Sequence, residues 1–331
     1  MRSCSASETA PDGSTHGRAF VCPLCQSSLE SGHGVLECGP CGKQWPVIEG
    51  IAKFAAGVAD SGLLPASELR ELVSRAKTGS WKMALSNHPS ARVRQAAQPE
   101  LYIQRVNWRW LLDLPLVSRI LDLGAGLGAN SHALATPDTE IFAADPTSEC
   151  AQFMRHRFTQ ENLPNIQVVW SSLWTLPCAP DSFDLVVIDG ALKRIVEGRS
   201  ENPRRLEQSG LQRVYDFLRP GGYLYLAVEH SSVLATLARR RRDGYFSAHS
   251  IQGFCRSLKT AGFSDVQPYL VLPNHAEPRF FVPQTAALFA YYLHSFNPSP
   301  DGRLRRAAYN LLSGLHVQQR LEKSFAIFAR K

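Results

Sequence analysis

Apolar residues recur along the chain with two different periods, and the change of period divides the sequence. Between residues 60 and 115 they return about every 3.6 positions, as in LPASELRELVSRA, which predicts helices with Ser67 at a cap position. From Ile120 onward, short apolar runs alternate with helical stretches. This alternation predicts an α/β fold, in which a parallel sheet carries helices on both faces and binds ligands at the carboxyl ends of its strands.

The apolar runs also place the individual elements. Strands are expected at residues 119–124, 140–145, 166–171, 183–189 and 222–229, and helices at 130–136, 148–160 and 203–219. Before the first strand, LYIQRVNWRWLLDL is expected to be helical. Its Trp108 and Trp110, together with Trp81, are expected to pack in the core.

Four of the eight cysteines form two C-x-x-C pairs near the N-terminus. Twelve residues separate Cys22 and Cys25 from Cys38 and Cys41. Each pair can aim two thiolates at one ion, and two pairs complete a tetrahedral site without an open position, which predicts a structural Zn²⁺. The alternative is a redox role, but a redox C-x-x-C would begin a helix in a βαβ unit, and no such unit surrounds these cysteines.

The end of this module, CGKQWPVIEGI, resembles zinc ribbons of methyltransferase-activator subunits and of some bacterial methyltransferases. In that family the second cysteine pair runs into an aromatic-Pro-Val-x-x-Gly-Ile strand, here Trp45 to Ile51. The other four cysteines are scattered along the chain. This distribution fits a reduced, cytoplasmic protein with one metal site.

The run ILDLGAGLGAN leads into a glycine-rich loop that fits two cofactors. Gly124, Gly126 and Ala129 satisfy the dinucleotide pattern G-x-G-x-x-G/A. Gly124, Gly126 and Gly128 equally satisfy the G-x-G-x-G loop of S-adenosylmethionine enzymes. Both cofactors want an acidic residue at the end of the second strand to bind ribose hydroxyls, and Asp145 stands there.

Three features separate the two cofactors, namely Asp122, Asp189 at the tip of the fourth expected strand, and the turn and strand LRPGGYLYL. A carboxylate two residues before the first glycine would repel a pyrophosphate but suits a ligand with an ammonium and a sulfonium. In order, ILDLGAGLG, the Asp145 strand end, SFDLVVIDGAL and LRPGGYLYLAVE resemble class I S-adenosylmethionine-dependent methyltransferases over about residues 100–270. The resemblance implies a Rossmann-like, seven-stranded, mostly parallel sheet.

The same resemblance implies which residues contact the cofactor. They are Asp122, Gly124, Gly126, Gly128, Asp145, Pro146, Ser172, Leu173 and Asp189. The glycines and the Asp189 carbonyl would hold the methionine part, Asp145 the ribose, and Pro146 would pack near the adenine. Ser172 departs from the family pattern, which usually has an Asp there to contact the adenine amino group.

The acceptor side carries weaker signals. After the fourth strand many small-molecule members have Glu-His, whereas this chain has Lys193 and Arg194, so a general base is missing there. Histidines near other expected strand ends or loops are the candidate bases, namely His230, His249 and His275.

The C-terminal half resembles methyltransferases of bacterial polysaccharide clusters. The resemblance is carried by ENPRRLEQ, LRPGGYLYLAVEH, AGFSDVQPYLVLPNHAEPRFFVP and LEKSFAIFARK. The chain departs from that group at residues 229–231, where the group has Glu-Asn-Arg, and at residues 273–275, where it has Pro-Asp-Tyr. The resemblance implies methylation of a small molecule, such as a hydroxyl of a saccharide or another metabolite.

Charge and hydropathy leave other partners open. The net charge of +7 favours anionic partners, so an RNA-base methyltransferase that reads RNA with the ribbon is an alternative, and a non-catalytic partner-binding scaffold is another. The ribbon lacks aromatic residues bracketed by Lys or Arg, which counts against RNA. No apolar run reaches the roughly 18–20 residues of a membrane span, although peripheral membrane contact stays open. The oligomeric state is not assigned.

These patterns divide the chain into consecutive parts. We expect a disordered tail (1–18), a zinc ribbon (19–55), a helical linker or cap (56–115), a methyltransferase core (116–274), a helical insertion (275–322) and the last core strand (323–331).

Overall fold

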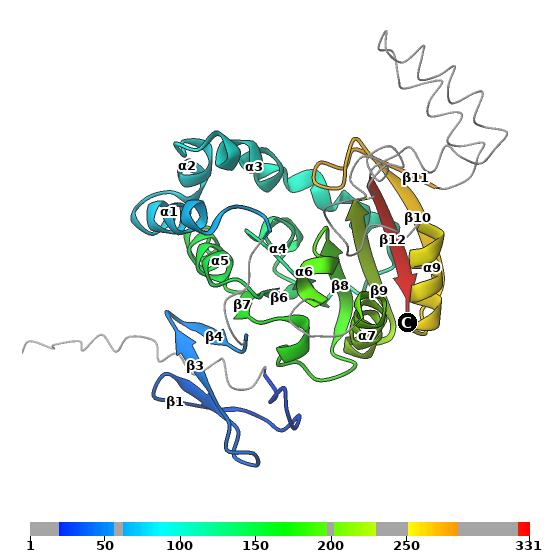
Figure 1. Cartoon of the computed structure of the whole chain (residues 1–331), viewed down its shortest axis with the longest axis horizontal. Coiled ribbons are helices and arrows are strands. Elements are labelled where there is room, and N and C mark those ends of the chain that lie inside the picture. Colours follow the sequence, from blue (N-terminus) through cyan, green and yellow to red (C-terminus); the bar gives the residue numbers. More distant parts are fainter. Residues whose placement is uncertain (1–19, 56–61, 197–201, 230–250, 284–323) are drawn as a thin grey trace, which may run out of the picture.

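A single sheet organises the chain. The computed structural model describes residues 20–55, 62–196, 202–229, 251–283 and 324–331. Within these ranges 12 strands follow the order β1-β2-β3-β4-β7-β6-β5-β8-β9-β12-β10-β11 (Figure 1). The expected seven strands form the contiguous block from β7 to β10, but the count of seven is wrong, because strands are added at both edges.

The centre of the sheet is parallel, as expected. It consists of β5 (Ser118–Leu123), β6 (Thr139–Asp145), β7 (Ile166–Trp170), β8 (Phe183–Asp189) and β9 (Leu218–Glu229). Each contains the strand expected there or agrees with it to within two residues, and β9 also begins earlier than expected. Apolar residues alternate between the two faces, so that Leu121 and Leu123 join one core and Ile120 the other.

The C-terminal strands run antiparallel to their neighbours. β12 (Ser324–Arg330) lies between β9 and β10 (Ser264–Leu272), and β11 (Phe280–Pro283) pairs with β10. The strand β11 corrects the expectation of a purely helical insertion at 275–322, since its backbone completes the sheet edge. The rest of that insertion, from 284 to 322, lies outside the described residues, as do the expected tail, His230 and His249.

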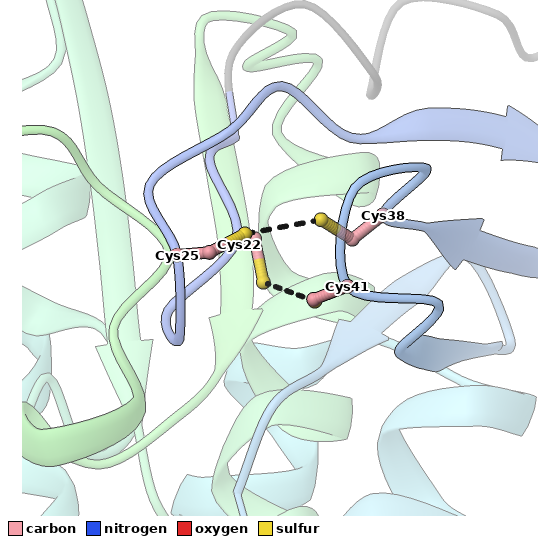
Figure 2. Close-up of side chains that lie close together, drawn as sticks. All are labelled: Cys22, Cys25, Cys38 and Cys41. Atoms are coloured by element: carbon pink, nitrogen blue, oxygen red, sulfur yellow. Dashed lines mark hydrogen bonds between the residues drawn. The ribbon is translucent and has the colours of Figure 1, made fainter.

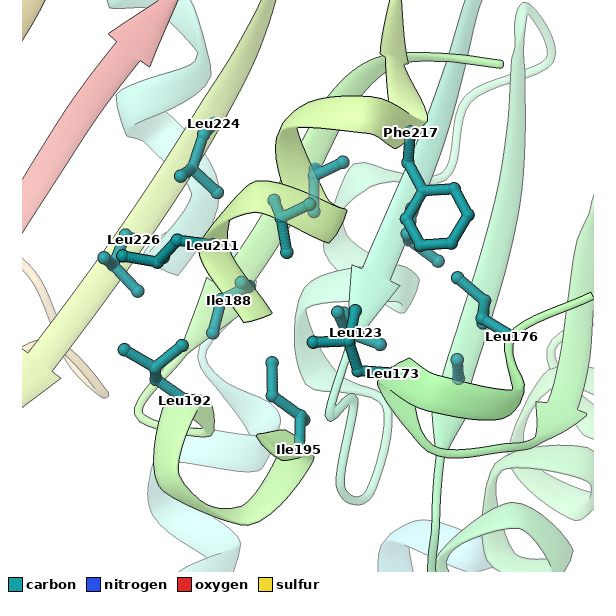
Figure 3. Close-up of a cluster of buried hydrophobic side chains, with 14 of the residues drawn as sticks. Leu123, Leu173, Leu176, Ile188, Leu192, Ile195, Leu211, Phe217, Leu224 and Leu226 are labelled. Carbon is teal, nitrogen blue, oxygen red and sulfur yellow. The ribbon is translucent and has the colours of Figure 1, made fainter. Parts of the chain in front are cut away.

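Helices cover both faces, as expected. One core is closed by α6 (Leu192–Val196), α7 (Pro203–Phe217) and α9 (Ile251–Thr260). Figure 3 shows part of this core, in which Leu211 and Ile195 belong to the same cluster as the strand residues Ile188 and Leu224. The other core is closed by α4 (Ala129–Leu134), α5 (Ser148–Gln160) and the 3-10 helix η1 (Ile103–Leu111).

The helices before the sheet depart from expectation in detail. They are α1 (Ala66–Thr78), α2 (Trp81–Ser86), α3 (Ala91–Leu101) and η1, which replaces the α-helix expected over LYIQRVNWRWLLDL. The residue capping α1 is Pro65, not Ser67, and it makes no side-chain cap bond. Trp81 and Trp108 are buried as expected, but Trp110 is 74% exposed, because it lies on the solvent side of η1.

A buried arginine fastens these helices to the sheet domain. Arg157 on α5 donates hydrogen bonds to Glu100 Oε2 (2.9 Å) and to the carbonyl of Leu127 (2.9 Å). Its guanidinium also lies over the ring of Trp81, 4.1 Å from the centroid. Glu100 belongs to α3 and Leu127 to the glycine-rich loop. The guanidinium of Arg157 therefore connects the helices before the sheet with this loop.

Residues 20–55, which we call the four-cysteine unit, form the other edge of the sheet. Its strands are β1 (Glu30–Gly32), β2 (Val35–Glu37), β3 (Gln44–Ile48) and β4 (Ile51–Lys53). Successive strands pair antiparallel, and β4 then pairs in parallel with β7. The unit is therefore continuous with the central sheet. In the described part of the chain, no helix is long and apolar enough to cross a membrane.

Candidate functional site

The glycine-rich loop leaves β5 at the carboxyl edge of the sheet. Gly124, Gly126 and Gly128 have φ angles of +76°, +59° and +84°, a region that L residues with side chains rarely adopt. A Cβ at Gly128 would lie 2.6 Å from Phe158 Cζ, so this glycine is also required by packing. The amide of Gly124 donates to the carbonyl of Ala144 (2.8 Å), which ties the loop to β6.

Asp145 ends β6 beneath this loop and is fully buried. Its Oδ2 accepts a hydrogen bond from the amide of Gly126 (2.9 Å), and its Oδ1 accepts one from the amide of Thr147 (2.9 Å). The carboxylate thus shapes the loop as well as presenting negative charge at the strand end.

Arg194 extends from α6 to the glycine-rich loop and Asp145. In the sequence it stood out only as a departure from the family pattern. Its Nη2 donates to the carbonyl of Gly124 at 2.7 Å, and its Nη1 lies 3.4 Å from Asp145 Oδ2. A guanidinium of the chain therefore contacts acceptors on both the loop and the strand end.

Asp122 turns away from this edge. Its Oδ2 accepts hydrogen bonds from the amide (3.0 Å) and the hydroxyl (2.6 Å) of Ser131, so the side chain anchors the start of α4. Burial raises the pKa of Asp122 to about 7, and the negative charge of Asp189 adds to the rise. The hydrogen bonds from Ser131 act in the opposite direction and lower this pKa. The hydrogen bonds of Asp122 thus position the start of α4, directly after the glycine-rich loop.

The raised pKa predicts a pH dependence of stability. In the folded state the pKa of Asp122 is about 7, against 3.8 for a free carboxyl. Between these values the folded chain keeps a proton that the unfolded chain releases, so this group lowers stability as pH rises from about 4 to 7, by at most about 1.4 kcal/mol per pH unit. In Asp122→Asn this contribution is expected to vanish.

Urea unfolding across that pH range measures the effect as the difference between wild type and variant. Glu207, whose pKa burial also raises to about 7, remains in both proteins and cancels. Identical slopes in the two proteins would contradict the assignment.

Asp189, at the end of β8, gathers side chains from distant parts of the chain. Its Oδ1 lies 2.5 Å from His275 Nδ1, and its Oδ2 accepts from Arg105 Nη2 (2.7 Å) and Asn130 Nδ2 (3.1 Å). Burial alone would raise the pKa of Asp189, but His275 and Arg105 hold it well below its usual range. The carboxylate of Asp189 is therefore charged, and it connects three side chains from different parts of the chain.

His275 comes from the loop after β10. Its backbone amide donates to Ser324 Oγ (2.8 Å), which positions the loop on β12. A Cβ at residue 190 would lie 2.7 Å from His275 Cε1, so Gly190 makes room for the ring. Among the candidate bases, His275 is the one within the described residues, and the structure brings it to the candidate site.

Sequence reasoning missed Arg105 and Asn130. Arg105 was assigned to a packing helix, and no local pattern indicates that η1 turns its guanidinium toward Asp189. In the described ranges, Arg105 Nε and Asn130 Oδ1 are buried without a hydrogen-bond partner. Buried polar atoms usually have partners, so a bound ligand could satisfy these two.

Pro146, Ser172 and Leu173, which were expected to contact the cofactor, lie in three different surroundings. Pro146 is buried beside Asp145, and its carbonyl accepts from the indole of Trp170 (2.9 Å). The hydroxyl of Ser172 lies 3.1 Å from Thr175 Oγ1, where it caps the short helix η2 (Leu173–Thr175). Leu173 is buried in the core, in the same cluster as Leu123 at the end of β5 (Figure 3).

The cysteine pairs meet at one point, as their spacing predicts. The sulfur atoms of Cys22, Cys25, Cys38 and Cys41 all lie within 4.8 Å of one another. Figure 2 marks two sulfur–sulfur contacts, Cys22–Cys41, which measures 3.6 Å, and Cys25–Cys38, which measures 3.3 Å. Four sulfurs about 2.3 Å from a zinc ion would form a tetrahedron with edges of about 3.8 Å, so the set has the size of a zinc site.

With this geometry established, the comparisons identify the domain. A family described as a methyltransferase domain matches residues 120–222, which span the glycine-rich loop, Asp145 and Asp189. Over this segment the chain is therefore similar to methyltransferases.

Curated relatives of this methyltransferase domain have several acceptors in their names. A demethylmenaquinone methyltransferase of Clavibacter sepedonicus is 35% identical over 130 residues, which are 39% of this chain and 48% of the relative. A release factor glutamine methyltransferase of Shewanella oneidensis is 26% identical over 163 residues, 43% of this chain and 57% of the relative. The chain thus spans about half the length of the curated relatives it matches.

Among solved structures, phosphoethanolamine N-methyltransferase 2 of Haemonchus contortus in complex with S-adenosylmethionine aligns at a TM-score of 0.46. The two chains are 14% identical, and the alignment covers 69% of this chain and 52% of the other.

Proposed function

We propose that this chain transfers a methyl group from S-adenosylmethionine to a hydroxyl of a small-molecule acceptor. The observation that carries the proposal is the His275–Asp189 pair beside the glycine-rich loop of the methyltransferase domain. A histidine oriented by a buried carboxylate is a common general base, and an acceptor hydroxyl must lose a proton when it is methylated.

The residues at the strand ends fit this cofactor. The Gly124 carbonyl and the Asp145 carboxylate already hold a planar cation of the chain, the Arg194 guanidinium. Acceptors that satisfy a guanidinium would also suit the ammonium and the ribose hydroxyls of S-adenosylmethionine. Asn130 Oδ1, buried without a partner in the described part of the chain, adds a further acceptor next to Asp189.

The chemistry then follows from the charges. When bound, S-adenosylmethionine supplies a methyl group on a positively charged sulfur. His275 donates from Nδ1 to Asp189, so its Nε2 takes the proton of the acceptor hydroxyl. The acceptor oxygen would take the methyl group as the sulfur leaves, and the proton would stay on the imidazole of His275, where the Asp189 carboxylate would stabilise the positive charge.

The acceptor class follows from the resemblance to polysaccharide-cluster methyltransferases, which favours a saccharide or a similar metabolite. The names of the curated relatives favour a second class, a demethylmenaquinone-like quinol. A quinol also carries hydroxyls that a histidine base could deprotonate, which would activate its ring for methylation at carbon instead of oxygen, so the same dyad serves either class. For RNA as acceptor no residue of the described chain offers comparable support.

Methyl transfer can be tested with S-adenosylmethionine that carries an isotopic label in its methyl group. Separate incubations with saccharide acceptors, a soluble demethylquinol and total RNA are expected to label a small molecule. Label that appears only in RNA would overturn the acceptor class. Calorimetry with S-adenosylhomocysteine tests whether the chain binds the cofactor product. No detectable binding would favour the non-catalytic scaffold.

Arg194 makes a separate prediction about cofactor affinity. Because its guanidinium occupies acceptors on Gly124 and Asp145, it must move before a ligand can use them. Arg194→Ala is therefore expected to tighten S-adenosylhomocysteine binding about threefold to tenfold. Arg204→Ala, which removes an exposed arginine on α7, is the control and should leave the dissociation constant unchanged. Weaker binding by Arg194→Ala would mean that the guanidinium holds the cofactor.

We also propose that the four cysteines bind a structural Zn²⁺. The sulfur spacing supports it, since all four ligand atoms approach one point and would leave no position for a substrate. Zinc stoichiometry measured by metal analysis of the purified chain tests this proposal.

A further inference from the structure

The four-cysteine unit shares backbone hydrogen bonds with the strand that leads to the candidate cofactor site. Lys53 of β4 pairs with Trp170 at the carboxyl end of β7. The amides of Phe54 and Ala55 then both donate to the carbonyl of Trp170, at 2.8 Å and 2.9 Å. The unit therefore holds β7 at the end from which the next loop begins.

That next loop, residues 171–177, is held by the same unit at its far end. The amide of Val21, adjacent to Cys22, donates to the carbonyl of Pro177 at 2.9 Å. Between these attachments, the amide of Ser171 donates to the carbonyl of Asp145 at 3.0 Å. Backbone hydrogen bonds hold both ends of this loop to the four-cysteine unit, and one from Ser171 ties the loop to the residue assigned to the cofactor ribose.

Apolar packing follows the same path. Phe20 lies between Phe54 and Phe142, with ring centroids 5.5 Å and 6.1 Å away. Phe142 belongs to β6, the strand that ends at Asp145. Cys22 and Cys38 are themselves buried members of this core. The metal ligands are therefore packed against the sheet of the methyltransferase domain and do not belong to an independent module.

The small size of the four-cysteine unit makes its folding dependent on a metal ion. Its strands have 3, 3, 5 and 3 residues, and β1 is exposed along its whole length. So small a unit buries little apolar surface of its own, and metal binding then supplies much of its folding free energy. Loss of the ion should release Trp170 and Pro177 together.

We propose that the four-cysteine metal site is an allosteric site for cofactor binding, with Zn²⁺ as its ligand. Zinc folds the unit, the folded unit positions the loop at 171–177 and Asp145, and this arrangement favours the cofactor. The proposal rests on the proposed function. Coupling between two sites is reciprocal, so the cofactor should strengthen zinc binding by the same factor, within the roughly 5- to 150-fold range of allosteric couplings.

Calorimetry on the full chain tests the coupling. Removal of zinc with a chelator is expected to weaken S-adenosylhomocysteine binding about tenfold or more. In the reverse experiment, saturating S-adenosylhomocysteine should slow and reduce zinc transfer to a chromophoric chelator. Equal affinity with and without zinc would overturn the proposal while leaving the proposed function intact. No binding even by the zinc-loaded chain would remove both.

A variant separates the coupling from the metal itself. Phe54→Ala keeps all four cysteines but removes the ring that packs against Phe20, which in turn contacts Phe142 of β6. It should bind stoichiometric zinc yet bind S-adenosylhomocysteine more weakly. Cys255→Ser on α9, outside the cysteine cluster, is the matched control and should change neither property. Unchanged cofactor affinity in Phe54→Ala would count against the proposal.

Hydrogen exchange distinguishes local coupling from general unfolding. On zinc removal the amides of residues 171–177 should exchange faster, while those of β9, on the far side of the sheet centre, should keep their protection. Uniform loss of protection throughout the sheet would show that zinc acts on global stability, and the allosteric proposal would fail.

Discussion

Replacing His275 with alanine is expected to lower kcat about 100-fold to 10,000-fold, because the acceptor hydroxyl loses its general base. The imidazole lies 2.5 Å from Asp189 Oδ1, and alanine leaves the rest of the Asp189 cluster in place. The kcat–pH profile should also lose its acidic limb, which follows protonation of the base. Initial rates with the acceptor identified by isotope transfer provide the measurement.

Two further variants make this result specific. His156→Ala removes a partly buried histidine on α5, whose charged neighbours are Glu49, Lys77 and Arg155, and should leave kcat unchanged. Asp189→Asn should reduce kcat and also lower thermal stability, since it leaves the buried Arg105 without its carboxylate. If His275→Ala retains the wild-type rate and pH profile, His275 is not the base.

Replacing Asp145 with alanine is expected to weaken S-adenosylhomocysteine binding about 100-fold. A buried carboxylate that accepts hydrogen bonds from a ligand contributes about 1.5–3 kcal/mol for each bond, and a ribose offers two hydroxyls. Alanine also frees the amides of Gly126 and Thr147, which Asp145 now holds at 2.9 Å each. Calorimetric titration of the folded variant measures the loss.

The controls for Asp145 separate charge from loop shape. Asp145→Asn can still accept a hydrogen bond through its amide oxygen, so it should keep more loop order than alanine but bind the ribose less well. Asp138→Ala changes an exposed residue just before the other end of β6 and should bind normally. If Asp145→Ala binds as tightly as wild type, the cofactor does not use this strand end.

Much of the sheet could be predicted from the sequence because its signal is local. The runs that form β5, β6, β7 and β8 are apolar on both faces, since helices cover both sides, and each ends in a turn signal. The edges could not be predicted this way. β4 and β11 have 3 and 4 residues, and whether so short a segment joins a sheet depends on which neighbour has an unpaired edge.

The candidate site shows the same division. The glycines, Asp145 and the cysteine pairs were found from the sequence because their spacing carries their geometry. Asp122 was marked too, and in the structure its carboxylate accepts hydrogen bonds from Ser131. Arg105 and Arg194 were missed as site residues, since an arginine in a helical segment is usually solvated and nothing local indicates otherwise.

The sequence by itself determined the α/β sheet, the glycine-rich cofactor loop and the set of four cysteines, because each depends on residues close together in the chain. Only the tertiary structure decided which base meets Asp189, where Arg194 points, and that the four-cysteine unit extends the methyltransferase sheet. His275 and Asp189 are 86 positions apart, and β4 and β7 are joined across more than a hundred residues. Such contacts are selected by the packing of the whole chain, which no local pattern of residues records.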